Sequence, residues 1–359
     1  MHQVVNRLKY FIRYKIIWKD KKINKVAFIT GAAGFIGFHL SNYLLSLDWN
    51  VVGLDAMTNY YDVNLKKNRY KVLKKIKKFD GYIGLIQDQN LLNEIYDIHK
   101  PNVIIHLAAQ AGVRYSINNP LSYTEANLIG TFHILEMARK FNPDHLLIAS
   151  TSSVYGNNKV IPFSENQKCD TPISFYAATK KSNEVMAHSY SHLFQIPTTI
   201  FRFFTVYGPW GRPDMALFKF TKKILSRQPI DVYNYGNMKR DFTSVYDLVE
   251  AISLLIDKKP LHPQKRKLKV DYDSISNTAP YRIVNIGNSK SINLLDYIHE
   301  LEKNLGIEAK KNLIEMQDGD VVNTLSNINL LESLTGFRPK VTLEEGVLDF
   351  VNWYKSYYK

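Results

Sequence analysis

The sequence has very little cysteine, no long apolar run and no cluster of metal-ligating side chains. Cys169 is the single cysteine of 359 residues, so no intramolecular disulfide can form and an intracellular, cytoplasmic location is expected. No run of about 18 consecutive apolar residues occurs, so the sequence predicts no membrane-spanning helix. No Cys or His residues gather with the spacing of a metal site, and no bound metal is expected.

Acidic residues are scarce in two segments, and this scarcity accounts for the net charge of +14. Residues 1–25 contain eight Lys or Arg and one Asp, and residues 64–78 contain eight Lys or Arg and no acid. The remainder of the chain is therefore close to neutral, which argues against a nucleic-acid partner. Residues 64–78 are predicted to form a solvated helix with Leu65, Val72 and Ile76 on one face.

Residues 1–24 precede the first recognisable element and are predicted to be a basic extension. Val5, Leu8, Ile12 and Ile16 recur at helical spacing, with Lys and Arg between them. An uninterrupted apolar stretch and a small-residue cleavage site are both missing, so a signal peptide is not predicted. The extension is expected to be disordered or loosely docked. The alternative is a helix that lies on an anionic membrane surface.

Apolar, strand-like stretches alternate with helical patterns over the first two thirds of the chain. The strand-like stretches occupy residues 26–29, 50–55, 102–109, 145–150 and 197–208. This alternation predicts an α/β fold with a doubly wound parallel sheet. The rhythm loosens after about residue 206. We therefore expect a doubly wound domain over 25–205 and a smaller substrate-binding region over 206–359 that is partly interleaved with it.

A glycine turn joins the first strand to the first helix. Gly31, Gly34 and Gly37 are spaced by three residues, and Asp55 ends the second strand 18 residues after Gly37. Glycines allow the backbone to approach a pyrophosphate, which the helix N-terminus attracts. The Asp55 carboxylate would accept hydrogen bonds from the adenosine ribose and repel a 2′-phosphate. The sequence therefore predicts a Rossmann fold that binds NAD in preference to NADP.

Tyr176 and Lys180 in "YAATK" are four residues apart, so on a helix they share one face. The pKa of an unperturbed tyrosine is roughly 10. A neighbouring ammonium and the positive nicotinamide ring would both favour its anion. Tyr176 is therefore a candidate base, with Thr151 at the end of a predicted strand as its neighbour.

Seven stretches together resemble a known family. These are "TGAAGFIG", "HLAAQAGVRYSI", "STSSVYG", "YAATKKSNE", "RFFTVYGPWGRPDMA", "RDFTSVYD" and "YRIVNIGNS". They resemble the extended short-chain dehydrogenase/reductases, more narrowly the nucleotide-sugar epimerases, and most closely those that epimerise UDP-glucuronate at C4. The resemblance runs from about residue 25 to the C-terminus. It implies NAD as cofactor, a UDP-sugar substrate and a homodimer that pairs the helices near 125–140 and 176–192.

The same resemblance assigns roles residue by residue. The implied catalytic residues are Thr151, Tyr176 and Lys180. The implied cofactor contacts are Gly31, Gly34, Phe35, Ile36, Gly37, Asp55, Ala108, Ala109, Gln110, Asn127, Tyr176, Lys180 and Phe203. The implied or candidate substrate contacts are Arg114, Ser116, Ser152, Ser153, Thr205, Arg212, Arg240 and Asp320. In this scheme Arg212 and Arg240 contact the diphosphate, and Asp320 contacts the uridine ribose.

Three residues depart from the family pattern. Ala56 stands where these enzymes usually have Asn near the adenosine ribose. Leu85 stands where they usually have an Asp facing adenine, and Asp318 replaces a usual Pro. None of the three belongs to the predicted reacting centre.

The hydroxyl run Thr151-Ser152-Ser153 favours one reaction. Oxidation of a uronic acid at C4 gives a β-keto acid, which loses CO₂ readily. Ser152, Ser153 and Thr205 are neutral hydrogen-bond donors suited to holding its carboxylate. In the dehydratases that the chain resembles, an acid follows the Thr. The sequence therefore favours epimerisation of UDP-glucuronate to UDP-galacturonate through a 4-keto intermediate.

Three alternatives remain open at this point. The first is a 4-epimerase of a neutral sugar such as UDP-glucose or UDP-N-acetylglucosamine, although such enzymes tend to carry Asn at the position of Thr205. The second is a uronate decarboxylase, and the third is a non-catalytic NAD-binding regulatory protein. His39 and His106 are interpreted as packing residues rather than catalysts.

Overall fold

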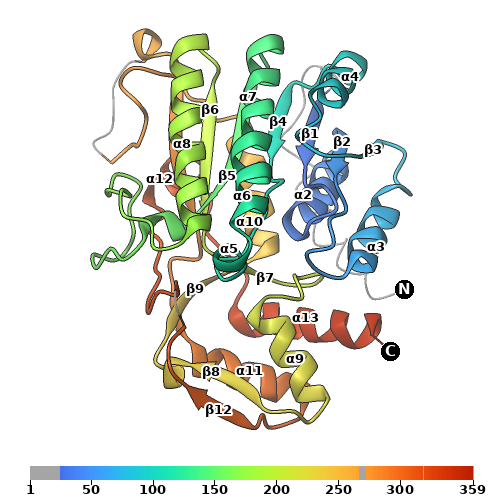
Figure 1. Ribbon diagram of the computed structural model, residues 1–359, viewed down its shortest axis with the longest axis vertical. Coiled ribbons are helices and arrows are strands. Elements are labelled where there is room, and N and C mark those ends of the chain that lie inside the picture. The colour runs from blue at the N-terminus through green and yellow to red at the C-terminus, as the bar shows by residue number, and fades with distance from the viewer. Residues whose placement is uncertain (1–24, 267–271, 318, 359) are drawn as a thin grey trace.

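The computed structural model describes residues 25–266, 272–317 and 319–358 (Figure 1). The predictions made for residues 1–24 and for Asp318 lie outside these ranges. Within them, no helix is both long and apolar enough to cross a membrane.

Seven parallel strands form the large sheet, in the order β10–β6–β5–β4–β1–β2–β3. The strands are β1 (Val26–Thr30), β2 (Asn50–Asp55), β3 (Phe79–Ile83), β4 (Val103–His106), β5 (His145–Thr151), β6 (Thr198–Phe203) and β10 (Tyr281–Ile286). The order reverses between β1 and β4, and ligands of such sheets bind in the crevice at this point. The predicted doubly wound Rossmann fold is confirmed.

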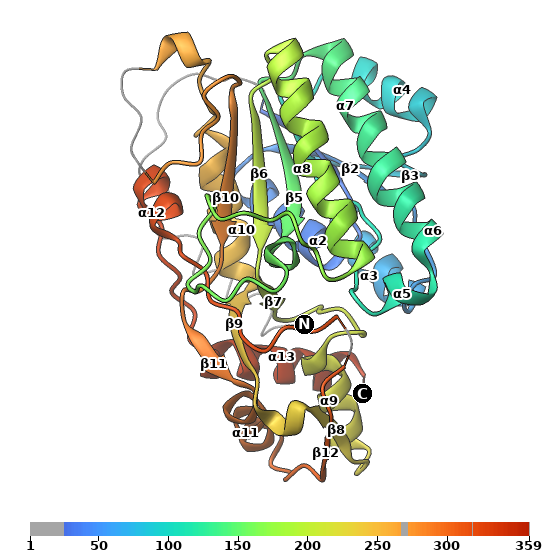
Figure 2. The ribbon, with the colours of Figure 1, turned by 60° about the vertical axis from the view of Figure 1, so that its left-hand side comes forward.

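Helices cover both faces of the sheet (Figure 2). Side chains alternate along β1, so Ala27 and Ile29 pack into one apolar cluster while Val26 and Phe28 pack into another. The first cluster contains residues of α2 (Phe35–Ser46), α10 (Val245–Ile256) and α12 (Asn329–Thr335). The second contains residues of α4 (Gln89–His99), α7 (Gly130–Phe141) and α8 (Phe175–Phe194).

A smaller lobe lies beside the end of the large sheet at which α8 begins (Figure 1). Its strands are β7 (Thr205–Tyr207), β8 (Ile230–Tyr233), β9 (Lys239–Ser244), β11 (Ser291–Asn293) and β12 (Lys311–Ile314). Its helices are α9 (Ala216–Leu225), α11 (Leu294–Leu305) and α13 (Leu343–Tyr357). A third apolar cluster fills this lobe. Between these elements the chain returns to the large sheet through α10, β10 and α12, so the two parts interleave in sequence.

The basic helix predicted over 64–78 is present as α3 (Val63–Leu73), but its burial differs from the prediction. Lys66 is 6% exposed and Arg69 is 0% exposed, whereas Val72 is 37% exposed. The prediction of a solvated face was wrong for these two cations. Each of the two donates hydrogen bonds to backbone carbonyls of neighbouring loops, and these bonds offset the cost of burying the charge.

A buried carboxyl makes the stability of this fold depend on pH. Glu165 is 6% exposed, and its Oε1 accepts a hydrogen bond from the Asn285 N–H at 2.9 Å. Burial raises the pKa of Glu165 from 4.5 to about 7, although this hydrogen bond and the charge of Arg202 oppose the rise. The contribution of the proton to stability is therefore complete below about pH 4.5 and is lost as the pH rises through 7.

Replacing Glu165 by Gln should remove this pH dependence, because an amide does not titrate and can keep the bond to Asn285. As the pH rises from 4.5 to 8, the parent should lose up to about 3 kcal/mol of unfolding free energy through Glu165, and the variant should not show this loss. Urea titrations at both pH values measure the difference. Parallel pH profiles for the two proteins would contradict the assignment.

Candidate functional site

The glycine turn lies where the large sheet reverses its order. Gly31 has a φ of +74°, in the left-handed region that favours glycine, and its N–H donates to the Leu54 carbonyl at 2.7 Å. A Cβ at Gly31 would lie 2.9 Å from the Ala108 nitrogen, so a side chain does not fit. Helix α2 begins directly after Gly34. The turn therefore forms a cradle at a helix N-terminus that fits a pyrophosphate.

Asp55 is fixed to this turn at the end of β2. Its Oδ2 accepts a hydrogen bond from the Ala33 N–H at 3.0 Å, and its Oδ1 accepts one from the Met57 N–H at 2.8 Å. Each carboxylate oxygen keeps a lone pair for a ribose hydroxyl. The carboxylate is followed by Ala56, which supplies no cation for a 2′-phosphate. The cradle and the carboxylate together fit NAD.

Two apolar side chains stand next to Asp55. Ile83 ends β3 opposite Asp55, and Ile83 and Leu85 are 65% and 53% exposed. The N–H of the intervening Gly84 donates to the Asp55 carbonyl at 3.1 Å. Any contact that these two side chains make with an adenine ring is therefore apolar.

Asn127 holds the segment that follows β4. It lies in the π-helical segment η2 (Thr124–Ile129). Its amide accepts from the Gln110 N–H at 2.8 Å and donates to the Gln110 carbonyl and to Thr179 Oγ1. Asn127 thus ties the cofactor side of the sheet to helix α8. π-Helical turns are rare and often mark functional sites, and the helical periodicity of the sequence gave no signal for this one.

Other predicted cofactor residues lie at the same end of the large sheet. Ile36 and Gly37 lie in the first turn of α2, Ala109 follows β4, and Phe203 ends β6 next to Thr151 of β5.

Thr151 and Tyr176 meet at the end of β5 and the start of α8. Thr151 caps the turn that follows β5, because its Oγ1 accepts a hydrogen bond from the Ser153 N–H. Burial raises the pKa of Tyr176, whereas the charge of Arg212 and a hydrogen bond with Thr151 lower it. The two predicted catalytic side chains therefore lie close together. Arg212 and Thr151 oppose the effect of burial, which still holds the pKa of Tyr176 above its ordinary value.

Lys180 lies one helical turn beyond Tyr176 and is 3% exposed. Its Nζ donates to the Ala149 carbonyl at 2.9 Å, and burial lowers its pKa from 10.5 to about 8. The sequence predicted that Lys180 lowers the Tyr176 pKa. In this structure the ammonium is held against β5, and Arg212 and Thr151 are the groups that oppose the burial-induced rise of the Tyr176 pKa.

The predicted hydroxyl group lies at the carboxyl ends of neighbouring strands. Thr151 pairs with Phe203 in the sheet, so Ser152, Ser153 and Thr205 follow two adjacent strand ends. All three are partly exposed. Thr205 also lines a small cavity that continues to Arg212. The side chains that follow these two strand ends are thus neutral hydrogen-bond donors.

Arg212 is held in place by an acid two residues away. Its Nε donates to Asp214 Oδ1 at 3.0 Å, and Tyr60 donates its hydroxyl proton to Asp214 Oδ2 at 3.0 Å. The ion pair with Asp214 raises the pKa of Arg212, which stays charged. Arg212 therefore supplies a fixed positive charge next to Tyr176.

Arg114, Asp320 and Arg240 form a second charged group, between the two parts of the molecule. Arg114 Nη2 lies 2.8 Å from Asp320 Oδ2, and its guanidinium lies 4.7 Å from the centre of the Tyr233 ring. Arg240 donates to the Val322 carbonyl at 3.0 Å, and Asp320 and Arg114 both act on its pKa. The cluster carries two cations and one anion, which suits a diphosphate.

Some candidate residues serve the fold in this structure. Ser116 is 1% exposed and donates its hydroxyl proton to the Val113 carbonyl, and its role as a substrate contact stays a prediction. His106 lies between Thr30 and Thr131, and burial lowers its pKa to about 3. Its neutral ring is a packing residue, as interpreted from the sequence.

Comparison with known proteins identifies the class to which this fold and site belong. The model of the NAD dependent epimerase/dehydratase family matches residues 27–270. The chain belongs to this family, and its cofactor is NAD.

Individual relatives extend the similarity to nearly the whole chain. The probable UDP-glucuronate 4-epimerase of Rhizobium meliloti (strain 1021) is 50% identical over 92% of this chain and 97% of its own length. Protein CapI of Staphylococcus aureus is also 50% identical, over 92% of this chain and 98% of its own length. Among solved structures, the UDP-glucuronic acid 4-epimerase of Bacillus cereus, in complex with UDP-glucuronic acid and NAD, has a TM-score of 0.82 and 32% identity and covers 93% of this chain and 100% of that chain.

Proposed function

We propose that this chain is a UDP-glucuronate 4-epimerase that interconverts UDP-glucuronate and UDP-galacturonate with no net redox change. The observation that carries the proposal is the contact of Thr151 with Tyr176 beside a run of neutral hydroxyls. The similarity to proteins named as epimerases of this sugar supports it.

The protein's own side chains carry the proton chemistry. NAD, when bound, supplies the acceptor and donor for the hydrogen at C4. Tyr176, as phenolate, accepts the proton of the O4 hydroxyl as the C4 ketone forms, and it returns a proton to O4 when C4 is reduced on its other face. Thr151 hydrogen-bonds at the same oxygen, and the Arg212 charge favours the phenolate.

The remaining contacts hold the substrate while the ketone turns over. Arg212 and Arg240 contact the diphosphate, and Asp320 contacts the uridine ribose. Ser152, Ser153 and Thr205 donate to the C6 carboxylate. These assignments are the ones that the family resemblance implies. They are supported by the cavity that Thr205 and Arg212 share, by the Arg114–Asp320 ion pair and by the adjacent ends of β5 and β6.

Product analysis tests the proposal directly. The purified enzyme is incubated with UDP-glucuronate, UDP-glucose and UDP-N-acetylglucosamine in separate reactions, and the products are resolved by chromatography. We expect UDP-galacturonate from the first and little product from the other two. Rapid turnover of UDP-glucose with no turnover of UDP-glucuronate would overturn the proposal and favour a neutral-sugar epimerase.

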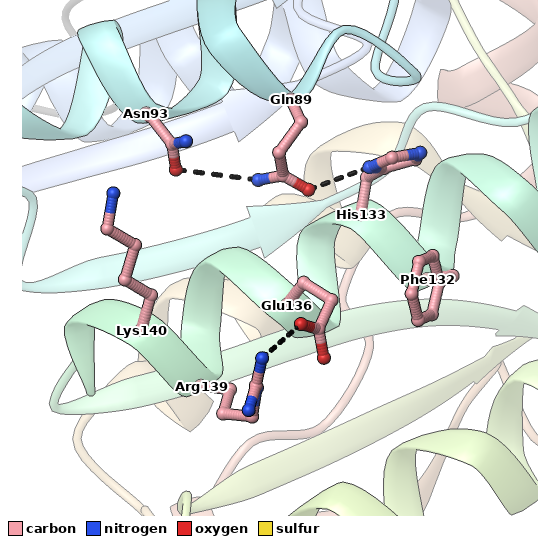
Figure 3. Close-up of a pocket in the computed structure, with 7 residues that line it drawn as sticks. All are labelled: Gln89, Asn93, Phe132, His133, Glu136, Arg139 and Lys140. Atoms are coloured by element: carbon pink, nitrogen blue, oxygen red, sulfur yellow. Dashed lines mark hydrogen bonds and ion pairs between the residues drawn. The ribbon is translucent and has the colours of Figure 1, made fainter.

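We further propose that two copies pair through α7 and α8, which lie side by side (Figure 2). One ridge consists of Leu121 in α6 (Pro120–Tyr123), Ile129 at the end of η2 and Phe132 in α7. Val185 and Leu193 form the next ridge on α8, and all five side chains are 42–66% exposed. Exposed apolar ridges on adjacent helices are typical of a dimer face. Figure 3 shows Phe132 at the end of a hollow between α4 and α7, in which Gln89 bonds to His133 and Arg139 bonds to Glu136.

Sedimentation equilibrium should therefore give a mass near twice the 41.5 kDa of one chain. Charges placed on the ridges, as in Phe132→Glu with Val185→Glu, should produce a monomer. Leu348→Glu on α13, where the leucine is 43% exposed, is the matched control. A parent that sediments as a monomer would overturn this proposal.

Residues 1–24 are proposed to set location rather than to take part in catalysis. They carry seven Lys or Arg and one Asp. A chain shortened to begin at Asn24 should keep its turnover number and lose binding to vesicles that contain anionic lipid. A shortened chain that folds yet has no activity would contradict the first expectation, and equal vesicle binding would contradict the second.

A further inference from the structure

Three successive carbonyls of the loop between β7 and α9 are bound by side chains from the cofactor half. His39 of α2 has its Nε2 2.8 Å from the Pro209 carbonyl. Arg69 of α3 donates through Nη2 to the carbonyls of Trp210 and Gly211. Burial lowers the pKa of His39 to about 4, so its neutral ring donates from Nε2.

The loop is held in an uncommon conformation. Trp210 has a φ of +59°, which is unusual for a bulky residue and persists only where the surroundings enforce it. Its ring packs against Phe38 of α2 and against Trp353 and Tyr357 of α13. The next residue but one is Arg212, which acts on Tyr176. The position of this loop therefore decides where the Arg212 charge lies.

The other terminal nitrogen of the Arg69 guanidinium bonds to the glycine turn. Nη1 donates to the Ala33 carbonyl at 3.0 Å and to the Tyr61 hydroxyl at 2.8 Å. The N–H of the same Ala33 donates to the Asp55 carboxylate. One guanidinium thus bonds at once to the turn that binds the cofactor and to the loop that carries Arg212.

The surroundings of Arg69 are unusual for a buried cation. It is 0% exposed, and in the described part of the chain no carboxylate lies within ion-pair distance and its Nε has no hydrogen-bond partner. A buried charge without an anion is costly, and an apolar residue would fill the volume without that penalty. The planar fork of Arg, however, holds two separate segments in a fixed geometry through nitrogens that are set apart, whereas the donors of Lys all lie on one nitrogen.

We propose that Arg69 is a positioning residue that couples the two halves of the site, so that NAD on the glycine turn tightens binding of a uridine diphosphate group at the loop of Arg212, and the reverse. The proposal rests on the proposed function only in taking a uridine diphosphate as the second ligand. Linkage requires the two effects to be equal.

Binding measurements without turnover test the coupling. The dissociation constant of UDP is measured by calorimetry on the full chain with and without saturating NAD. In the parent we expect NAD to tighten UDP binding by about fivefold or more, within the usual range of such couplings. In Arg69→Met the factor should fall close to one. If Arg69 served the fold alone, Arg69→Met would weaken UDP binding equally with and without NAD, and the ratio of the two dissociation constants would stay at the parent value.

Two further variants keep the test decisive. Arg282→Met removes another buried arginine, which pairs with Asp273 on the far edge of the sheet, and should leave the coupling factor intact. Arg69→Lys keeps the positive charge but not the planar guanidinium, so it should also lose the coupling. This variant serves as the test if Arg69→Met does not fold. A parent without coupling, or a folded Arg69 variant with the parent factor, would overturn the proposal. Neither result depends on which sugar the enzyme epimerises.

Discussion

Replacing Tyr176 by Phe should lower the turnover number about 10²–10⁴-fold, the usual contribution of a positioned acid–base group. Phenylalanine keeps the ring that packs near Tyr123 but cannot accept the O4 proton. Thr151 lies close enough to act on the Tyr176 hydroxyl and would remain in place without supplying a base of comparable strength. The loss should therefore fall on the turnover number rather than on the affinity for the sugar nucleotide.

The control is a tyrosine whose hydroxyl serves the fold alone. Tyr155 is 1% exposed and donates to Asn285 Oδ1 at 2.7 Å. Tyr155→Phe should cost about 1 kcal/mol of stability and leave the turnover number within a few fold of the parent. Calorimetry should give the same NAD affinity for both variants. Near-normal turnover in folded Tyr176→Phe would remove Tyr176 from the reaction.

Local patterns were sufficient for the parts of this molecule that depend on neighbours in sequence. The positive φ of Gly31 and the strand-end position of Asp55 follow from spacing, because a turn and a strand are short-range structures. The four-residue interval between Tyr176 and Lys180 likewise places both on one face of α8. The alternation of strands and helices predicted the sheet for the same reason.

The parts that could not be predicted depend on contacts between distant segments. Arg69 looked like one cation among eight in a solvated helix, and only tertiary contacts with Ala33 and Trp210 bury it. The hydrogen bond from the Ser116 hydroxyl to the Val113 carbonyl likewise has no signal in the sequence. The partner of Lys180 is a carbonyl of β5, which helical spacing cannot reveal. Short-range pattern therefore located the site, while long-range packing determined its electrostatics.

The hydroxyl run after Thr151 should decide how cleanly the enzyme treats a uronic acid. A C4 ketone with a C6 carboxylate loses CO₂ when the C5–C6 bond aligns with the carbonyl π system. The electron pair of that bond then forms the enolate of a 4-keto-pentose, which takes up a proton at C5. Donors that hold the carboxylate away from this alignment suppress the loss. Thr205 lines the cavity next to Arg212, and Ser152 and Ser153 follow the adjacent strand end.

Thr205→Ala is the cleanest variant, because Ser153 also bonds to Thr151 through its backbone N–H and its hydroxyl. A hydrogen bond to a charged group contributes roughly 1.5–3 kcal/mol. The ratio of UDP-4-keto-pentose to epimerised product should therefore rise about tenfold or more. Ser152→Ala with Ser153→Ala should act in the same direction. Mass spectrometry of the products after a fixed number of turnovers measures the ratio.

Thr335→Ala at the end of α12 is the matched control, since the bonds of the Thr335 hydroxyl within the described residues go to its own helix end, to Leu331 and Phe337. It should leave the product ratio at the parent value even if it lowers stability. Because the carboxylate is charged throughout the reaction, the higher ratio of UDP-4-keto-pentose to epimerised product in Thr205→Ala should persist when a lower temperature slows turnover. If folded, NAD-loaded Thr205→Ala and the double serine variant both keep the parent ratio, these hydroxyls do not restrain the carboxylate, and the side chains that do must lie elsewhere in the crevice.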